Sequence, residues 1–167
     1  MDKNWAYIKN LINNNAIDEI VEICKQMETC EFQVIKNNLI QELGNTDIAN
    51  HRNTIAIVLS DLKCDEAVET LVKSILDPKN RNNRGTLIYA LKELKCESII
   101  KNLIHVLFNG NFEVKWNMYD LLSKKIKYMS KSDQLECMNI IREEKERVLD
   151  ELDLLEDVES NIFGMGE

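Results

Sequence analysis

Two neighbouring segments decide the fold, RNTIAIVLSDLKC at residues 52–64 and RGTLIYALKELKC at residues 84–96. They are displaced by about 32 residues and carry Arg, Thr, Leu, Lys and Cys at matching positions. Most of the differences exchange one apolar residue for another, as between Ile55 and Leu87. A period of this length indicates a stacked array of helical repeats. Such an array offers a binding surface and rarely an active site.

The rest of the chain continues this helical pattern. Apolar residues recur at intervals of three or four, and one proline and five glycines are few enough for an all-α chain. We expect one domain, residues 1–167, with a capping helix at 1–13 and hairpins at about 16–44, 51–77, 83–109 and 113–142. An acidic helix at about 143–160 and a tail at 161–167 follow. Ser132 is the expected N-cap of the last apolar stripe, which is one extended helix or two in series.

The net charge of −8 and the pI of about 4.9 restrict the possible partners. A duplex nucleic acid or an anionic membrane needs clustered Lys and Arg, so neither fits this balance. A basic protein fits it best because opposite charges speed encounter. The other interpretation is that the acidity serves solubility alone.

The five cysteines include no CxxC pair and are expected to pack as small hydrophobes. The chain begins Met1-Asp2-Lys3-Asn4-Trp5 without a basic and then apolar leader. It also has no apolar run of about 20 residues, the length of a membrane span. These features predict a reduced, cytoplasmic location.

Three loops that end in a basic residue carry a family resemblance. They run from Leu76 to Arg84, from Phe108 to Lys115 and, less closely, from Leu43 to Arg52. Each precedes two helical segments joined by a short turn, so the chain resembles the HEAT-like repeats, including the short phycobilisome-lyase type. The resemblance implies a short right-handed α-solenoid of about three hairpins with N- and C-terminal capping helices.

The resemblance also implies roles for particular residues. The basic residues Arg52, Arg84 and Lys115 would bond within the stack. The second helices would line a concave side that faces the partner. Their outward residues here are Asn37, Gln41, Glu66, Glu69, Lys73, Lys101 and His105.

The sequence shows little that would support catalysis. Only His51 and His105 could act as bases near neutral pH, and neither has a local Cys or Ser arrangement typical of a triad. There is no HExxH, CxxC pair, EF-hand loop or glycine-rich phosphate loop. We therefore predict no catalytic residue, no metal site and no cofactor.

A dense acidic run stands out near the end of the chain. It supplies further candidate partner-binding residues, Glu143, Glu144, Asp150, Asp153 and Asp157. One interpretation is a capping helix with a solvated outer face. The other is an acidic patch that mimics polyphosphate and fills the basic cleft of a nuclease. Among the aromatic residues, Tyr89, Trp116 and Tyr119 are expected to pack in first helices, whereas Phe112 and Phe163 are possible exposed anchors.

These observations favour a non-enzymatic protein-binding module. Its sharpest form is an immunity-type inhibitor that neutralises a basic toxin such as a nuclease through an acidic face. A regulatory or scaffolding adaptor that docks a peptide or helix in the concave groove is the first alternative. A lyase-like subunit is the second, and it would need a reactive thiol. The oligomeric state is open, with a monomer as the default.

Overall fold

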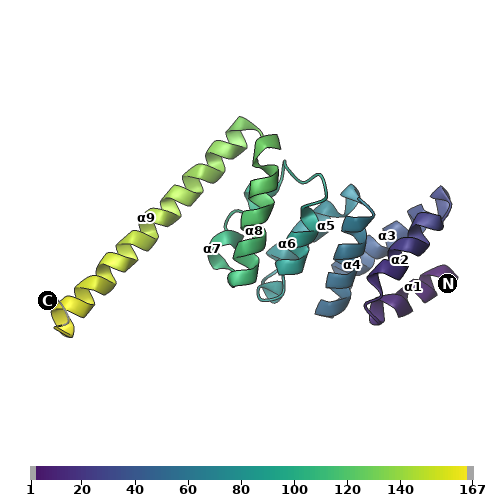
Figure 1. Cartoon of the computed structure of the whole chain (residues 1–167), viewed down its shortest axis with the longest axis horizontal. Coiled ribbons are helices and arrows are strands. Elements are labelled where there is room, and N and C mark those ends of the chain that lie inside the picture. Colours follow the sequence, from purple (N-terminus) through teal and green to yellow (C-terminus); the bar gives the residue numbers. More distant parts are fainter. Residues whose placement is uncertain (1–2, 165–167) are drawn as a thin grey trace.

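The computed structural model describes residues 3–164, and the regular secondary structure in that range is all helical, without a β-strand (Figure 1). The α-helices are α1 (Lys3–Asn13), α2 (Ile17–Gln26), α3 (Thr29–Asn45), α4 (Ala49–Asp61), α5 (Val68–Leu76), α6 (Gly85–Leu91), α7 (Val106–Asn109), α8 (Phe112–Lys125) and α9 (Lys131–Ile162). Short 3-10 helices lie between them: η1 (Asp65–Ala67), η2 (Pro78–Asn80), η3 (Ile100–Leu103) and η4 (Ile126–Tyr128). The prediction of an all-α chain is confirmed for the described residues.

Four helices form a continuous row. Helix α2 contacts α4, α4 contacts α6, and α6 contacts α8, so that consecutive first helices of the hairpins lie side by side (Figure 1). On the other side of this row α3 contacts α4 and α5, and η3 contacts the beginning of α9. The N-terminal helix α1 contacts α2 and α4 at one end of the row.

The sequence repeat coincides with the core. Ile55 and Leu59 of α4 are fully buried, and so are Leu87 and Leu91 at the same positions of α6. Apolar side chains spaced by four residues lie on one face of a helix, and burying each contributes roughly 1.5–3 kcal/mol. The repeated pattern therefore marks the faces on which neighbouring helices pack.

Helix ends follow local chemistry, with two departures from expectation. The first helix stops at Asn13, and Asn15 adopts a positive φ of 55°, which Asn tolerates better than most residues. Helix α9 starts earlier than predicted: its N-cap is Ser130, whose hydroxyl accepts a 3.0 Å bond from the Asp133 amide, and Ser132 lies inside the helix. An N-cap oxygen must sit two or three residues before the amide that it accepts from, and here Ser130 meets that geometry.

The second helix of the hairpin expected at about 83–109, from Ile99 to Leu107, is broken. This segment forms the 3-10 helix η3 and the four-residue α7. Four of its residues are β-branched (Ile99, Ile100, Ile104 and Val106), and such side chains lose rotamer freedom in an α-helix. Burial of Ile100, Leu103 and Ile104 still fixes the segment against the core.

The last helix leaves the row. Helix α9 is 32 residues long and unbroken, so the expected boundary at 142/143 falls inside it. Only Cys137 among its residues is buried, and most of the helix projects away from the other helices (Figure 1). None of the helices described between residues 3 and 164 combines the length and apolarity needed to cross a lipid bilayer.

Candidate protein-binding surface

The residues predicted to line a concave side do lie on the second elements of the hairpins. Asn37 and Gln41 are on α3, Glu69 and Lys73 are on α5, and His105 immediately precedes α7. All five are exposed, and the side-chain oxygen of Asn37 accepts a 3.1 Å hydrogen bond from the side-chain amide of Gln33. The remaining two, Glu66 in η1 and Lys101 in η3, form ion pairs with other helices of the chain.

Glu66 and Lys101 belong to a ladder of ion pairs that joins neighbouring hairpins. Lys36 of α3 pairs with Glu66, 30 residues further along the chain. Lys101 contacts Asp133 at 2.8 Å and Glu136 at 3.0 Å, both at the start of α9. These two predicted binding residues therefore fasten one repeat to the next.

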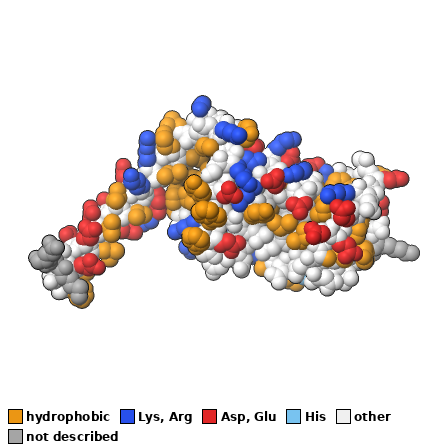
Figure 2. Space-filling model, viewed as in Figure 1, with side chains coloured by type: hydrophobic (Ala, Val, Ile, Leu, Met, Phe, Trp, Pro, Cys, Tyr) orange, Lys and Arg blue, Asp and Glu red, His pale blue; other side chains and the backbone are white. Residues whose placement is uncertain are grey.

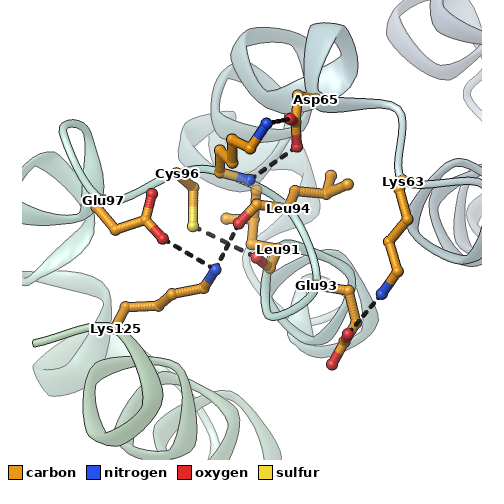
Figure 3. A network of polar contacts seen from close by, with 9 residues as sticks. Lys63, Asp65, Leu91, Glu93, Leu94, Cys96, Glu97 and Lys125 are labelled. Atoms are coloured by element: carbon orange, nitrogen blue, oxygen red, sulfur yellow. Dashed lines mark hydrogen bonds and ion pairs between the residues drawn. The ribbon is translucent and has the colours of Figure 1, made fainter. Parts of the chain in front are cut away.

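The central step of the ladder is reciprocal (Figure 3). The Lys63 ammonium lies 2.6 Å from a Glu93 oxygen, and the Lys95 ammonium lies 3.1 Å from an Asp65 oxygen. Asp65 also accepts a 2.9 Å bond from the Lys95 backbone amide, which is the main reason that its pKa is lowered. A bond from Lys63 likewise lowers the pKa of Glu93.

Two further lysines extend the ladder toward α8. Lys125 donates 2.6 Å to the Leu94 carbonyl oxygen and 3.1 Å to Glu97 (Figure 3). Lys92 is buried and lies 2.6 Å from an Asp120 oxygen, and this bond lowers the pKa of Asp120. Sequence reasoning missed the ladder, although opposite charges 30 residues apart in near-identical repeats are a usable signal.

The ladder predicts that acid destabilises the protein. Asp65, Glu93 and Asp120 have lowered pKa values in the fold, whereas the unfolded chain titrates at ordinary values of about 3.9–4.3. Their contribution is fully present above that range and is lost as the pH falls through the folded pKa values. We expect urea midpoints to be level from neutral pH to about pH 5 and to fall below about pH 4.5.

A matched variant isolates one step of the ladder. Lys92→Met removes the cation that faces Asp120 while keeping a long apolar stem. Its urea midpoint is expected to decline less steeply below about pH 4.5 than that of the unaltered chain. Identical slopes for the two proteins would contradict a contribution from this pair.

Two of the three basic loop residues bond within the stack, as expected. Arg52 donates to the Thr46 carbonyl oxygen at 3.2 Å. Arg84 donates to the carbonyl oxygens of Ile75 and Asn109, each at 3.4 Å. Both guanidinium groups are buried, and the loss of hydration lowers their pKa. Lys115 departs from the pattern, because its side chain is exposed, unlike those of Arg52 and Arg84.

The histidines and cysteines do not form a reactive cluster. His105 is exposed and His51 is half-buried, and residues 3–164 hold no group of three or more His, Cys, Asp or Glu suited to a metal ion. Cys24, Cys64 and Cys96 are buried, and burial raises the pKa of each thiol to about 11. Cys137 is buried as well. Cys30 is exposed, which corrects the expectation that it packs in the core.

The predicted acidic residues lie on α9. Glu143, Asp150, Asp153 and Asp157 are exposed, and Glu144 is half-buried. A bond from Arg147 lowers the pKa of Glu144, with weaker effects from His105 and Lys115.

The outer part of α9 carries an uncompensated negative charge. We define the acidic half of α9 as its six carboxylates after Val148, which are Asp150, Glu151, Asp153, Glu156, Asp157 and Glu159. No Lys or Arg occurs from residue 148 to 162. Within the described residues only Glu151 of this group forms an ion pair, with Arg147. The remaining five carboxylates face solvent without an internal cation.

The exposed aromatic residues were partly mispredicted. Phe112 and Phe163 are exposed as expected, at 82% and 66%. However, Trp116 and Tyr119 are also exposed, at 60% and 59%, and Tyr89 is half-exposed. The rings of Phe112, Trp116 and Tyr119 follow one another along α8, with centroids 6.5 Å and 5.7 Å apart. We call these three residues the aromatic face of α8.

No protein-family model, curated protein or solved structure matches the chain. Any functional assignment therefore rests on the geometry and chemistry described above.

Proposed function

We propose that this chain is a non-enzymatic protein-binding module that holds a basic partner against the acidic half of α9. Its row of hairpins is a short right-handed HEAT-like solenoid that displays this helix. In the sharpest form of the proposal the chain is a cytoplasmic immunity-type inhibitor, and the partner is a basic toxin such as a nuclease.

The observation that carries the proposal is the acidic half of α9. Five of its six carboxylates have no cation within the described chain, and the helix projects from the row. An isolated helix with this charge repels itself, because like charges three or four residues apart are destabilising. A basic partner removes that repulsion and gains coupling energy of roughly 1.5–7 kcal/mol per close charge pair.

The test compares two charge-neutralised variants of the full chain. One carries Asp150→Asn, Asp153→Asn and Asp157→Asn; the control carries Asp18→Asn, Glu22→Gln and Asp61→Asn at the opposite end. Partners are recovered from the native cells by tagged pull-down, and the on-rate for the recovered partner is then measured at several salt concentrations. We expect a basic partner whose on-rate falls about tenfold or more with the α9 variant. An acidic partner, or equal on-rates for both variants, would refute the proposal.

A helix-docking adaptor is the second candidate function. Exposed apolar residues on α8 and α9 favour it, since contiguous apolar surface marks protein-binding sites. Binding by this mode is expected to persist at high salt, whereas the charge-steered mode loses on-rate as ionic strength rises.

A further inference from the structure

Trp116 and Tyr119 of the aromatic face of α8 occupy positions that are covered in α6. The α6 residues at the repeat positions of Trp116, Tyr119 and Ser123 are Gly85 and Ile88, which are buried, and Lys92, which pairs with Asp120 of α8. A Cβ on Gly85 would clash with the Glu113 carboxylate, so this side of α6 faces α8 directly. The same spacing in α8 places Trp116, Tyr119 and Ser123 on the side where a further helix would pack.

No helix of the described chain covers that side of α8. Ile88 is 0% exposed, but Tyr119 at the matching repeat position is 59% exposed. Helix α9 contacts the row only near its beginning and then diverges from α8 (Figure 1). The row of first helices therefore ends on an aromatic surface.

Helix α9 supplies a second apolar wall. Met138, Ile141, Val148, Leu152, Leu155 and Ile162 recur at intervals of three, four or seven residues and form what we call the α9 stripe. All of them are exposed by 39% or more. Figure 2 shows apolar side chains at the junction of α9 with the row and along α9 itself. Such a stripe is the pattern with which one helix packs against another.

The two walls meet in an apolar groove. Its volume is about 310 Å³. Tyr119, Leu122 and Ile126 line it on one side and Met138 and Ile141 on the other, and Arg142 is the one charged residue of its lining. The groove joins the aromatic face of α8 to the first residues of the α9 stripe. We call the whole surface the α8–α9 notch.

We infer that the α8–α9 notch receives one amphipathic helix with a basic rim from a partner protein, in the place of the next first helix of the row. The inference rests on the proposed function and specifies its partner surface. The apolar side of the incoming helix covers Trp116, Tyr119 and the α9 stripe. Its Lys and Arg residues reach Glu151, Glu156 and Glu159, the carboxylates of the acidic half of α9 that lie on or beside the stripe.

Charge decides between a foreign helix and a second copy of this chain. Glu151, Glu156 and Glu159 lie on or beside the outer α9 stripe, whereas the helical period places Asp150, Asp153 and Asp157 toward the other side of α9; no Lys or Arg occurs from residue 148 to 162. A second copy brings a net charge of −8 and an acidic α9 of its own. Like charges across an interface cost several kcal/mol, whereas opposite charges fix the register of the pair. An amphipathic helix with basic residues beside its apolar side can bury the α9 stripe and pair with the carboxylates next to that stripe.

The experiment uses the full chain and three synthetic peptides of about 21 residues, which is three heptads and covers most of the α9 stripe. The first has Leu at heptad a and d positions and Lys and Arg elsewhere. The second has the same composition with the Leu residues out of register. The third has Glu in place of Lys and Arg. Binding is followed by the fluorescence of Trp116 in a Trp5→Phe background, because Trp5 and Trp116 are the two tryptophans.

We expect the first peptide to shift the Trp116 emission to shorter wavelength and to bind at least about tenfold more tightly than the other two. Tyr119→Ala is expected to weaken its binding about tenfold, as for a buried aromatic anchor. Tyr89→Ala is the matched control, since Tyr89 is a half-exposed tyrosine on the neighbouring helix α6. Its affinity is expected to stay within about twofold of that of the parent.

Three outcomes would overturn the inference. If the in-register and out-of-register basic peptides bind equally, charge alone accounts for binding. That result would refute docking in the α8–α9 notch but not the proposed function. If the acidic peptide binds as tightly as the first peptide, positive charge on the partner is not required, which would contradict both the proposed function and the basic rim of the incoming helix. A dimer that shields Trp116 in sedimentation and fluorescence measurements without peptide would show that the occupant is a second copy.

Discussion

Leu91→Ala is expected to lower the free energy of unfolding by about 2–5 kcal/mol. Leu91 is fully buried in α6, the helix that contacts both α4 and α8. Truncation removes the transfer energy of the side chain and leaves a cavity that helices held on two sides cannot close. Urea unfolding followed by far-UV circular dichroism measures the change.

An exposed leucine gives the matched control. Leu154 lies on the outer half of α9 and is 63% exposed, so Leu154→Ala is expected to change the free energy of unfolding by no more than about 0.5 kcal/mol. Leu59→Ala, at the repeat position of Leu91 in α4, should fall in the same range as Leu91→Ala. A small loss at both buried positions would contradict the assignment of the repeat to the core.

The core could be predicted because the repeat and the helical period report the same physical constraint. Ile55 and Leu87 sit one period apart, and both are fully buried. An apolar face that recurs in two neighbouring segments must be covered in both, since each hairpin buries its face against the next. The sequence alone was therefore sufficient for the all-α fold and for the residues at the centre of the row.

The ends of the array could not be predicted in this way. Tyr119 has the helical spacing of a packed residue, and Ile88 at its repeat position is fully buried. Whether that side of a helix is covered depends on the next helix, and α9 turns away instead of packing there. The periodicity of α8 carries no information about the direction of α9, so the exposed aromatic face was missed.

Most of the candidate binding residues are exposed as predicted, but Lys101 and Glu144 are half-buried, and the ion pairs of these residues were not predicted. Glu66 and Lys101 were predicted as partner-binding residues, and each forms an ion pair with a neighbouring hairpin that the sequence analysis did not predict. Helical spacing identifies the outward side of an element, whereas an ion pair depends on the offset between elements. That offset is about one repeat here, as the 30-residue separation of Lys63 and Glu93 shows.

Arg84→Ala is expected to lower the free energy of unfolding by about 2 kcal/mol, within the range for hydrogen bonds to charged groups. Arg84 donates to the carbonyl oxygens of Ile75, in the last turn of α5, and of Asn109, the last residue of α7. The last carbonyls of a helix have no partner within it and carry the negative end of its dipole. Arg81 still donates to Asn109 at 3.4 Å after the change, so the Ile75 carbonyl loses most.

Lys115→Ala tests whether position in the repeat or actual contact determines this effect. Lys115 stands where Arg84 stands one repeat earlier, but its side chain is exposed, so the expected change is within about 0.5 kcal/mol. Arg84→Met separates the hydrogen bonds from packing, since Met keeps an apolar stem of similar length. Replacing a buried charge by an apolar residue can be neutral when its bonds contribute little net energy. Equal stability of Arg84→Met and the parent would show that Arg84 serves the stack by its volume, and a loss close to that of Arg84→Ala would assign its role to the two helix ends.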